Sequence, residues 1–254
     1  MPTRIHYLSN AGIMVESGEK KVLIDALISH GHPVFNKYSP EIERRILSGE
    51  PPFDGVDLLL FTHYHLDHFD RHLAAQFCRN HPQVPVLSTG QAAKALRPLL
   101  PGWLMGEDHL HELNLEIGQA EKLELAGLEL TALALLHSGK EFAREQNLAF
   151  ILHLEKPVTH TGDAVNNRNN FSALLAAGAG GGVFVAPFPY ITLPLACKQF
   201  RNLLEPETLI AMHLPYPHCD PGGWIEAAHA ALQKQRDAGL NVILAEEEGS
   251  IYEV

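Results

Sequence analysis

The sequence predicts a mixed α/β sandwich in which blocks of strands are combined with helices. Two observations support this prediction. Short apolar runs of strand length recur along the whole chain, and longer segments bounded by capping or breaking residues lie between several of them. The runs also gather in blocks, above all over 120–161, whereas a repeating βαβ array would alternate strand and helix regularly. A hydrophobic fraction of 46% in 254 residues is sufficient for a large buried core.

In the first half of the chain, residues that break or cap regular structure mark the element boundaries. A turn-rich loop with Gly31 and Pro33 covers 29–39. The helix predicted over 41–47 is ended by Gly49 and the prolines at 51 and 52. Thr89 is the expected N-cap of a later helix. The predicted strands cover 4–8, 13–16, 21–26, 57–62 and 84–88, and the predicted helices cover 41–47, 69–80 and 89–96.

The second half begins with a block of strands and then alternates strands with helices. The predicted strands cover 120–125, 128–136, 149–154, 158–161, 183–186, 208–212, 241–245 and 250–253. The predicted helices cover 170–177, 193–204 and 221–238, the last with Asp220 as N-cap and Pro221 at its first position. No repeat, low-complexity segment or long linker divides the chain, so we expect one domain over residues 1–254.

Composition limits the class of protein. The net charge of −11 argues against a broad nucleic-acid surface, although a local basic patch remains compatible with it. No apolar run reaches the roughly 18 residues needed to cross a bilayer, and the N-terminal residues lack the pattern of a signal peptide. Three widely spaced cysteines form no disulfide framework. We therefore expect a cytoplasmic protein with no membrane partner and no nucleic-acid partner, and a homo-oligomer stays open.

The densest group of metal-competent side chains lies at 63–68, directly after the apolar run 57–61. Imidazole nitrogen and carboxylate oxygen are ligands for zinc-like divalent metals. On extended backbone His63 and His65 point to the same side, because strand side chains alternate with period two, so they can share one ion. Asp67 and His68 lie where the chain turns toward a helix and can face a second ion.

Further metal-competent residues follow other apolar runs. His137 comes after the strand predicted over 128–136, Asp163 after that over 158–161, and His213 after that over 208–212. The ligand crevices of α/β sheets lie at the carboxyl ends of strands, which is where these residues and His63 are expected. A single histidine in such a place is usually structural, but the repeated placement indicates a site.

These positions together resemble the metallo-β-lactamase-fold hydrolase superfamily. His-x-His-x-Asp-His at 63–68 is similar to its signature motif. His137 matches the third histidine of that superfamily, and Asp163 matches its bridging aspartate. His213 matches its final histidine, and Asp25 matches its early aspartate. The resemblance extends from about residue 4 to the C-terminus.

The resemblance implies a four-layer αβ/βα sandwich, the metallo-β-lactamase fold, with two divalent metal ions at one edge. It implies that the first ion is held by His63, His65 and His137, and the second by Asp67, His68 and His213. Asp163 would bridge both ions, and Asp25 would accept hydrogen bonds that fix the ligand-bearing loop. Zinc is the expected metal, and histidine and carboxylate ligands leave Mn²⁺ or Fe²⁺ open.

The activity implied is hydrolysis by a metal-bridging hydroxide, with Asp67 orienting the water and taking its proton. Asp163 stands where common zinc β-lactamases carry cysteine, and His65 where flavodiiron oxygen reductases carry glutamate. The chain is most similar to the small branch that includes ascorbate-6-phosphate lactonase-like proteins. We expect a small anionic ester, lactone or phosphodiester as substrate. The alternatives are a nuclease acting on RNA or DNA ends and a non-catalytic metal-binding module.

Substrate contacts are expected from loops near the same edge. Cationic side chains there could receive a phosphate or carboxylate. The stretch after His137 carries two of them, Lys140 and Arg144. The alternative for each is an ordinary loop residue. The candidate substrate contacts are His30, His32, Lys140, Arg168, Tyr190 and His218.

Overall fold

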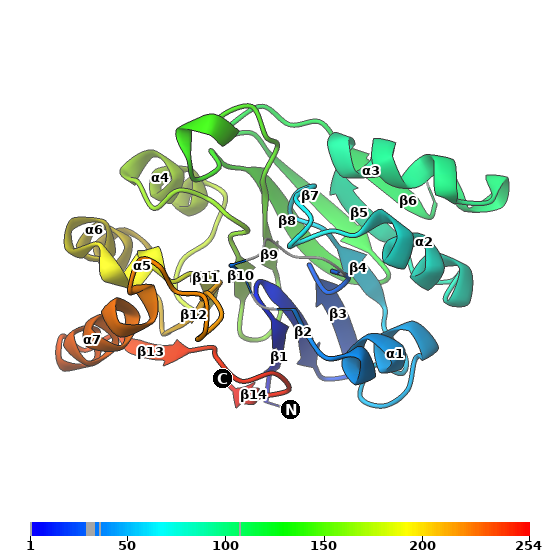
Figure 1. Ribbon diagram of the computed structural model, residues 1–254. Coiled ribbons are helices and arrows are strands. Elements are labelled where there is room, and N and C mark those ends of the chain that lie inside the picture. The colour runs from blue at the N-terminus through cyan, green and yellow to red at the C-terminus, as the bar shows by residue number, and fades with distance from the viewer. Residues whose placement is uncertain (1, 29–33, 36, 107) are drawn as a thin grey trace.

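Within the described residues, two seven-stranded sheets pack face to face, and helices cover the outer face of each (Figure 1). This computed structural model describes residues 2–28, 34–35, 37–106 and 108–254. The arrangement is the four-layer αβ/βα sandwich of the metallo-β-lactamase fold, as predicted. None of the helices in the described ranges combines the length and apolarity that a membrane crossing requires.

The first sheet has the order β14–β1–β2–β3–β4–β5–β6. Its strands are β1 (Arg4–Ser9), β2 (Gly12–Ser17), β3 (Lys20–Ile24), β4 (Leu58–Leu60), β5 (Val86–Thr89), β6 (Leu110–Leu113) and β14 (Ile251–Glu253). Pairing is antiparallel from β14 to β3 and parallel from β3 to β6. The associated helices are α1 (Pro40–Ser48), α2 (Arg71–Asn80) and α3 (Gly90–Leu96), followed by the 3-10 turns η1 (Arg97–Leu99) and η2 (Gly102–Leu104).

The second sheet repeats this pairing pattern in the order β13–β12–β11–β10–β9–β8–β7. Its strands are β7 (Ala120–Leu125), β8 (Leu128–Ala134), β9 (Leu148–Leu152), β10 (Val158–His160), β11 (Val183–Pro187), β12 (Thr208–Met212) and β13 (Asn241–Leu244). Pairing is antiparallel from β7 to β10 and parallel from β10 to β13. Its helices are α4 (Arg168–Ala176), α5 (Pro189–Thr192), α6 (Pro194–Leu204) and α7 (Trp224–Asp237), and the 3-10 turn η3 (Lys140–Phe142) follows β8.

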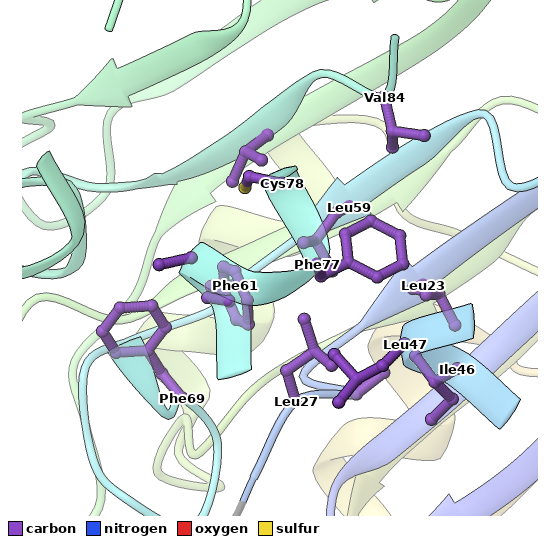
Figure 2. Close-up of a cluster of buried hydrophobic side chains, with 14 of the residues drawn as sticks. Leu23, Leu27, Ile46, Leu47, Leu59, Phe61, Phe69, Phe77, Cys78 and Val84 are labelled. Atoms are coloured by element: carbon purple, nitrogen blue, oxygen red, sulfur yellow. The ribbon is translucent and has the colours of Figure 1, made fainter. Parts of the chain in front are cut away.

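Hydrophobic cores lie between successive layers of the described chain. The central core joins inward side chains of the two sheets, such as Ile13 and Phe150. A second core lies between the first sheet and its helices and includes Ile46 of α1, Phe77 of α2 and Leu59 of β4 (Figure 2). The third lies under α4–α7. Strands buried on both faces explain the continuous apolar runs in the sequence.

The helix boundaries agree with the expected caps except at α7. Thr89 caps α3 as predicted, because its hydroxyl accepts from the backbone N–H of Ala92 at 3.3 Å. The helix predicted from Pro221 begins instead at Trp224. Gly223 precedes it in a left-handed conformation, with φ 62°, which a helix cannot contain. Asp220 still caps the helix, since its carboxylate accepts from the N–H groups of Trp224 and Ile225 at 2.8 and 2.9 Å.

Candidate metal centre

The carboxyl ends of strands in both sheets bring seven candidate residues to one place. The first sheet supplies the residues that follow β4, which are His63, His65, Asp67 and His68. The second supplies the residues that follow β8, β10 and β12, which are His137, Asp163 and His213. All four strands point to the same edge, as predicted for a ligand crevice. Most of these side chains are buried, and His65 is half-buried.

A first group consists of His63, His65 and His137, whose ligand atoms lie within 4.8 Å of one another. Nε2 of His63 lies 3.1 Å from Nδ1 of His65 and 3.4 Å from Nε2 of His137. The three rings meet edge to face, with centroids 4.7–4.9 Å apart. This geometry surrounds one small volume with imidazole nitrogens.

A second group consists of Asp67, His68 and His213. Nε2 of His213 lies 3.2 Å from Nε2 of His68 and 3.3 Å from Oδ2 of Asp67. Asp163 lies between the groups. Its Oδ1 is 3.3 Å from Nε2 of His68, and its Oδ2 is 3.3 Å from Nε2 of His213 and 3.8 Å from Nε2 of His137.

Asp25 lies directly behind these groups and is fully buried. Its Oδ1 accepts from the N–H of Thr62 at 2.8 Å, and its Oδ2 accepts from the Thr62 hydroxyl at 2.6 Å. Nδ1 of His68 lies 2.8 Å from the same Oδ2. Asp25 could also join His63 and His68 around an ion, but both its oxygens are already occupied by protein donors, so the geometry suits support of the loop better.

Hydrogen bonds determine which ring nitrogen of His63, His68 and His137 faces the centre. The Thr62 hydroxyl donates to Asp25, so it can only accept from Nδ1 of His63, which lies 3.0 Å away. Nδ1 of His137 donates to the carbonyl of Ser138 at 2.5 Å. In the neutral forms of His63, His68 and His137, Nε2 therefore carries a lone pair directed at the centre.

The pKa values of the groups shift in opposite directions. Burial and the nearby His68 lower the pKa of His63 well below its ordinary value, and burial also lowers the pKa of His65. Burial opposes charge on His213, but the carboxylates of Asp163 and Asp67 outweigh it and raise its pKa to about 9. His213 and His68 likewise outweigh burial and hold the pKa of Asp163 well below its usual range. Against burial, the carboxylates of Asp163, Asp25 and Asp67 likewise raise the pKa of His68. Ionised aspartates and the neutral imidazoles of His63 and His65 are already the forms that bind cations, whereas His68 and His213 would release a proton when a cation binds.

A divalent cation fits this donor set. Nε2 of His63 and Nε2 of His137, both acceptors, lie 3.4 Å apart, and a cation between them would relieve the repulsion of their lone pairs. Oδ1 of Asp163 is buried and accepts no hydrogen bond of good geometry from the described residues. A buried carboxylate oxygen without a donor is costly unless a cation neutralises it. Imidazole and carboxylate donors suit several divalent metals and do not select one.

Two asparagines position the centre, and neither was among the predicted site residues. Asn10 is buried, and its side-chain amide donates to the backbone carbonyl of Asp67 at 2.9 Å. Its backbone carbonyl accepts from the N–H of His213 at 3.1 Å. Asn147 accepts from the N–H of Asp163 at 2.9 Å. Neither lies in a motif with a recognisable spacing. The only sequence signal was that Asn10 follows the first predicted strand.

Unusual backbone conformations are concentrated here. Asn10, Asp25 and His213 all have positive φ, at 50°, 49° and 67°. Such conformations are uncommon for residues other than glycine and persist only where surrounding contacts enforce them. Gly162, with φ 55°, precedes Asp163, and a Cβ there would lie 2.4 Å from Oδ1 of Asn147 and 2.9 Å from Cβ of Thr62. Glycine at 162 thus lets the Asp163 loop approach the Thr62–Asp25 pair.

The predicted substrate contacts are only partly near the centre. His30 and His32 lie outside the described residues. Lys140, Arg168 and His218 are exposed, at the start of η3, at the start of α4 and beside Tyr216. Tyr190 is a correction, because its side chain is 1% exposed in the core under α4–α7 and its hydroxyl donates to the carbonyl of Ala164 at 3.2 Å. Its ring therefore supports the Asp163 loop and cannot contact a substrate.

Two phenylalanines that were not predicted lie against the centre. Phe35 meets the ring of His213 edge to face at 4.2 Å. Phe142, in η3, lies 4.8 Å from the ring of His65 and 5.3 Å from that of His137. Phe35 is distant in sequence from His213, and Phe142 lies in the loop that follows His137 but is distant in sequence from His65, so nothing in their local pattern indicated this role. They place apolar surface at the rim of a polar centre.

Sequence comparison gives a family match. A family model described as "Beta-lactamase superfamily domain" matches residues 20–177. The matched stretch includes Asp25, the residues at 63–68, His137 and Asp163, and it ends before His213. A search of curated protein sequences gives no match.

Solved structures share the fold at low identity. A structure described as a possible metal-dependent hydrolase from Veillonella parvula DSM 2008 has a TM-score of 0.70 at 17% identity over 100% of both chains. An isothiocyanate hydrolase from Delia radicum gut bacteria has a TM-score of 0.67 at 15% identity over 99% of each chain. CmlA, a diiron β-hydroxylase from Streptomyces venezuelae, has a TM-score of 0.68 at 14% identity. The match covers 100% of this chain and 54% of CmlA, so this chain spans about half of CmlA's length.

Proposed function

Because the chain belongs to the metallo-β-lactamase superfamily, we propose that it is a hydrolase that uses two divalent metal ions. The observation that carries this proposal is the convergence of imidazole nitrogens and carboxylate oxygens in one small volume, where Oδ1 of Asp163 is buried and accepts no hydrogen bond of good geometry from the described residues. A polar cluster of this kind is unfavourable in a protein interior unless cations complete it.

The ligand groups follow the distances. One ion would be held by His63, His65 and His137, and the other by Asp67, His68 and His213. Asp163 would bridge them, since its carboxylate lies near His68 and His213 of the second group and its Oδ2 also lies 3.8 Å from Nε2 of His137 in the first. Asp25 would act from behind through Thr62 and His68. Zinc is our first expectation, and Mn²⁺ or Fe²⁺ would suit the same donors.

Such ions, when bound, lower the pKa of coordinated water and polarise an oxygen of the substrate. The residues of this chain would supply orientation and proton handling. The side-chain amide of Asn10 donates to the backbone carbonyl of Asp67 and lies 3.4 Å from Oδ2 of its carboxylate. These two contacts fix the direction of the Asp67 carboxylate. We assign it the orientation of the attacking water and acceptance of its proton. Phe35 and Phe142 would keep the rim of the centre apolar and restrict bulk water.

The proposed substrate is a small anionic ester, lactone or phosphodiester, as in the ascorbate-6-phosphate lactonase-like branch. Measurement of metal content in the purified protein, followed by a hydrolysis panel of esters, lactones and phosphodiesters, tests this proposal. We expect two ions per chain and turnover that is lost on chelation and restored by metal. Two bound ions without turnover on any class would favour a non-catalytic module. Cleavage of RNA or DNA ends in the same panel would favour a nuclease.

A second candidate is oxygen-dependent chemistry at a pair of iron ions. It is favoured by one observation, the likeness in fold to CmlA, which is described as a diiron β-hydroxylase. Purification under conditions that retain iron, with absorption spectra and oxygen-consumption measurements, separates the two. Iron with oxygen consumption and no hydrolysis would support the second candidate against the first.

A further inference from the structure

A cavity of about 870 Å³ opens at the carboxyl ends of β5 and β6, and none of the seven residues of the metal centre lines it. Gly90, Gln91 and Lys94 of α3 line one side of it, and Asn114 follows β6. Arg144 and Gln146 line another side, and both belong to the loop that follows His137. No role has been assigned to this cavity by the metal chemistry above.

The cavity adjoins the metal centre along one sheet edge. β5 pairs with β4 in parallel, so Gly90 after β5 and His63 after β4 emerge at the same edge. Neighbouring strands lie about 4.8 Å apart. The loop after His137 also reaches both places, because Phe142 contacts the rings of His65 and His137 while Arg144 lines the cavity. A small molecule with one end at the centre could therefore extend into the cavity.

Hydrogen bonds hold this loop in place on the cavity wall. The side-chain oxygen of Gln146 accepts from the N–H of Gln91 at 3.1 Å, and the oxygen of Gln91 accepts from the N–H of Gln146 at 3.0 Å. The Gln146 amide also donates to Asn114 at 3.2 Å. A Cβ at Gly90 would lie 1.9 Å from Oδ1 of Asn114, so glycine is required for this close packing. The wall is thus built before any ligand arrives.

The charges lining the cavity are mainly positive. Lys94, Arg97 and Arg144 contribute cations, and Glu112 contributes one carboxylate that Arg97 already binds at 2.8 Å. The side chains of Lys94 and Arg144 form no hydrogen bond or ion pair with any described residue. Two unpaired cations at one cavity contrast with a chain whose net charge is −11. Unpaired cations that converge on a hollow favour an anionic ligand group.

We propose that this cavity binds an anionic group, a phosphate or a carboxylate, at the end of the substrate remote from the bond that is cleaved. Lys94 and Arg144 are its cationic contacts, and Gln91 and Asn114 border it with polar atoms. This assignment as a substrate subsite rests on the proposed hydrolase function. Binding of the anion itself does not, so the two can be tested separately.

The binding test uses inorganic phosphate and glutarate, titrated calorimetrically into the metal-loaded protein and into the protein after chelation. The Lys94→Ala/Arg144→Ala variant should bind both probes at least about tenfold more weakly in either state, since each charge-assisted contact contributes about a factor of ten. Both side chains are exposed, and circular dichroism checks that the variant is folded. Wild-type affinity for both probes in the variant would overturn the proposal.

A matched control removes two exposed, unpaired lysines from the opposite helical layer. Lys198→Ala/Lys234→Ala, in α6 and α7, changes net charge equally. It should bind both probes as the wild type does. An equal loss of affinity in this control would mean that overall charge, rather than the cavity, governs binding, and would also overturn the proposal.

The kinetic test compares half-esters that carry a terminal carboxylate with neutral esters of equal length. We expect the ratio of kcat/KM for the charged ester over the neutral one to fall at least about tenfold in Lys94→Ala/Arg144→Ala. An unchanged ratio in an active enzyme would reject the substrate subsite while leaving the hydrolase function intact. Absence of all hydrolysis in the wild type, with probe binding lost in the variant, would reject the hydrolase function and retain the anion site.

Discussion

At the scale of single residues, the direction of each imidazole depends on one hydrogen-bond partner. His63 and His137 each direct Nε2 toward the centre because a neighbouring oxygen accepts from Nδ1. His65 presents Nδ1 instead and is the half-buried member of the first group. Its ring is held between its partners and Phe142. Loss of this ring would remove a proposed ligand without opening a buried cavity.

Replacement of His65 by Ala should therefore empty the first metal site and reduce turnover by at least about a hundredfold, because one half of a two-metal site is lost. Metal analysis by mass spectrometry and initial rates measure both effects. His72→Ala, which removes an exposed histidine of α2, should retain both ions. Wild-type activity at unchanged metal content in His65→Ala would contradict the assignment.

Replacement of Asp163 by Ala should have a wider effect on metal content. Its carboxylate lies near His68 and His213 of the second group and near His137 of the first, so both ions should bind more weakly. Competition with a chromophoric chelator gives both affinities, and each should fall by at least about tenfold. If only one ion were lost and catalysis stayed normal, Asp163 would not be a bridging ligand.

The residues of the centre were predictable to the extent that they share a local pattern. The motif at 63–68 has a spacing that strand and turn geometry can interpret, and the other three proposed ligands each follow an apolar run. Asn10, Asn147 and Phe142 act across segments distant in sequence, and that proximity depends on sheet register. Tyr190 shows the same limit, because a position after a strand does not determine whether a ring points to solvent or to the core.

At the scale of elements, short strands and helix starts were the least predictable features. The strand β6 was not predicted, because its sequence Leu-His-Glu-Leu is only four residues long and carries two polar residues. Parallel pairing with β5 makes it a strand. The start of α7 was placed too early because Pro221 suits a first helical position, whereas Pro221 and Gly222 form a turn and Gly223 has a positive φ.

The cap of α7 gives a prediction at this scale. Asp220→Ala removes the acceptor of two N–H groups at the helix start and should lower the free energy of unfolding by about 1 kcal/mol. The shift in urea midpoint at constant slope measures it. Asp237→Ala, at the other end of the helix, loses one side-chain hydrogen bond and an unfavourable interaction with the helix dipole, and should change stability by ~0.5 kcal/mol or less. Equal effects of both variants would contradict the capping role.

At the scale of the whole molecule, His160 connects the two sheets. Its Nδ1 accepts from the N–H of Gly162 at 3.1 Å, so its Nε2 donates to the carbonyl of Ala11, which is 2.9 Å away in the turn between β1 and β2. Burial lowers its pKa. As pH falls, the imidazole of His160 therefore becomes protonated at a higher pH in the unfolded chain than in the folded protein. Stability is lost as pH falls below the unfolded pKa of about 6.5.

His160→Gln should remove this acid sensitivity. The variant should be less stable than the wild type at about pH 7. Between about pH 7 and pH 5 its free energy of unfolding should fall by less than that of the wild type, with a difference on the order of 1 kcal/mol. Urea unfolding of wild type and variant after chelation gives the comparison. An identical pH dependence in both would mean that His160 is not the buried neutral histidine described above.

Metal removal should act on the molecule as a whole, because ligands come from both sheets. An ion present at about a hundred times its dissociation constant stabilises the folded state by ~2.7 kcal/mol. About 1 kcal/mol shifts Tm by about 2–4 °C at this chain length, so chelation should lower Tm by at least about 5 °C and metal should restore it. An unchanged Tm after verified metal loss would show that the centre does not join the sheets.

The pairing of β14 with β1 has a practical consequence for handling this chain. Arg4 pairs with Glu253, and the two ends lie side by side in Figure 1. From that pair β1 runs six residues, or about 20 Å, before the chain reaches Asn10 at the metal centre. Affinity tags and fusion partners at either end would thus lie at the far side from the centre. A short peptide could also join the ends in a circularly permuted chain that is reopened elsewhere.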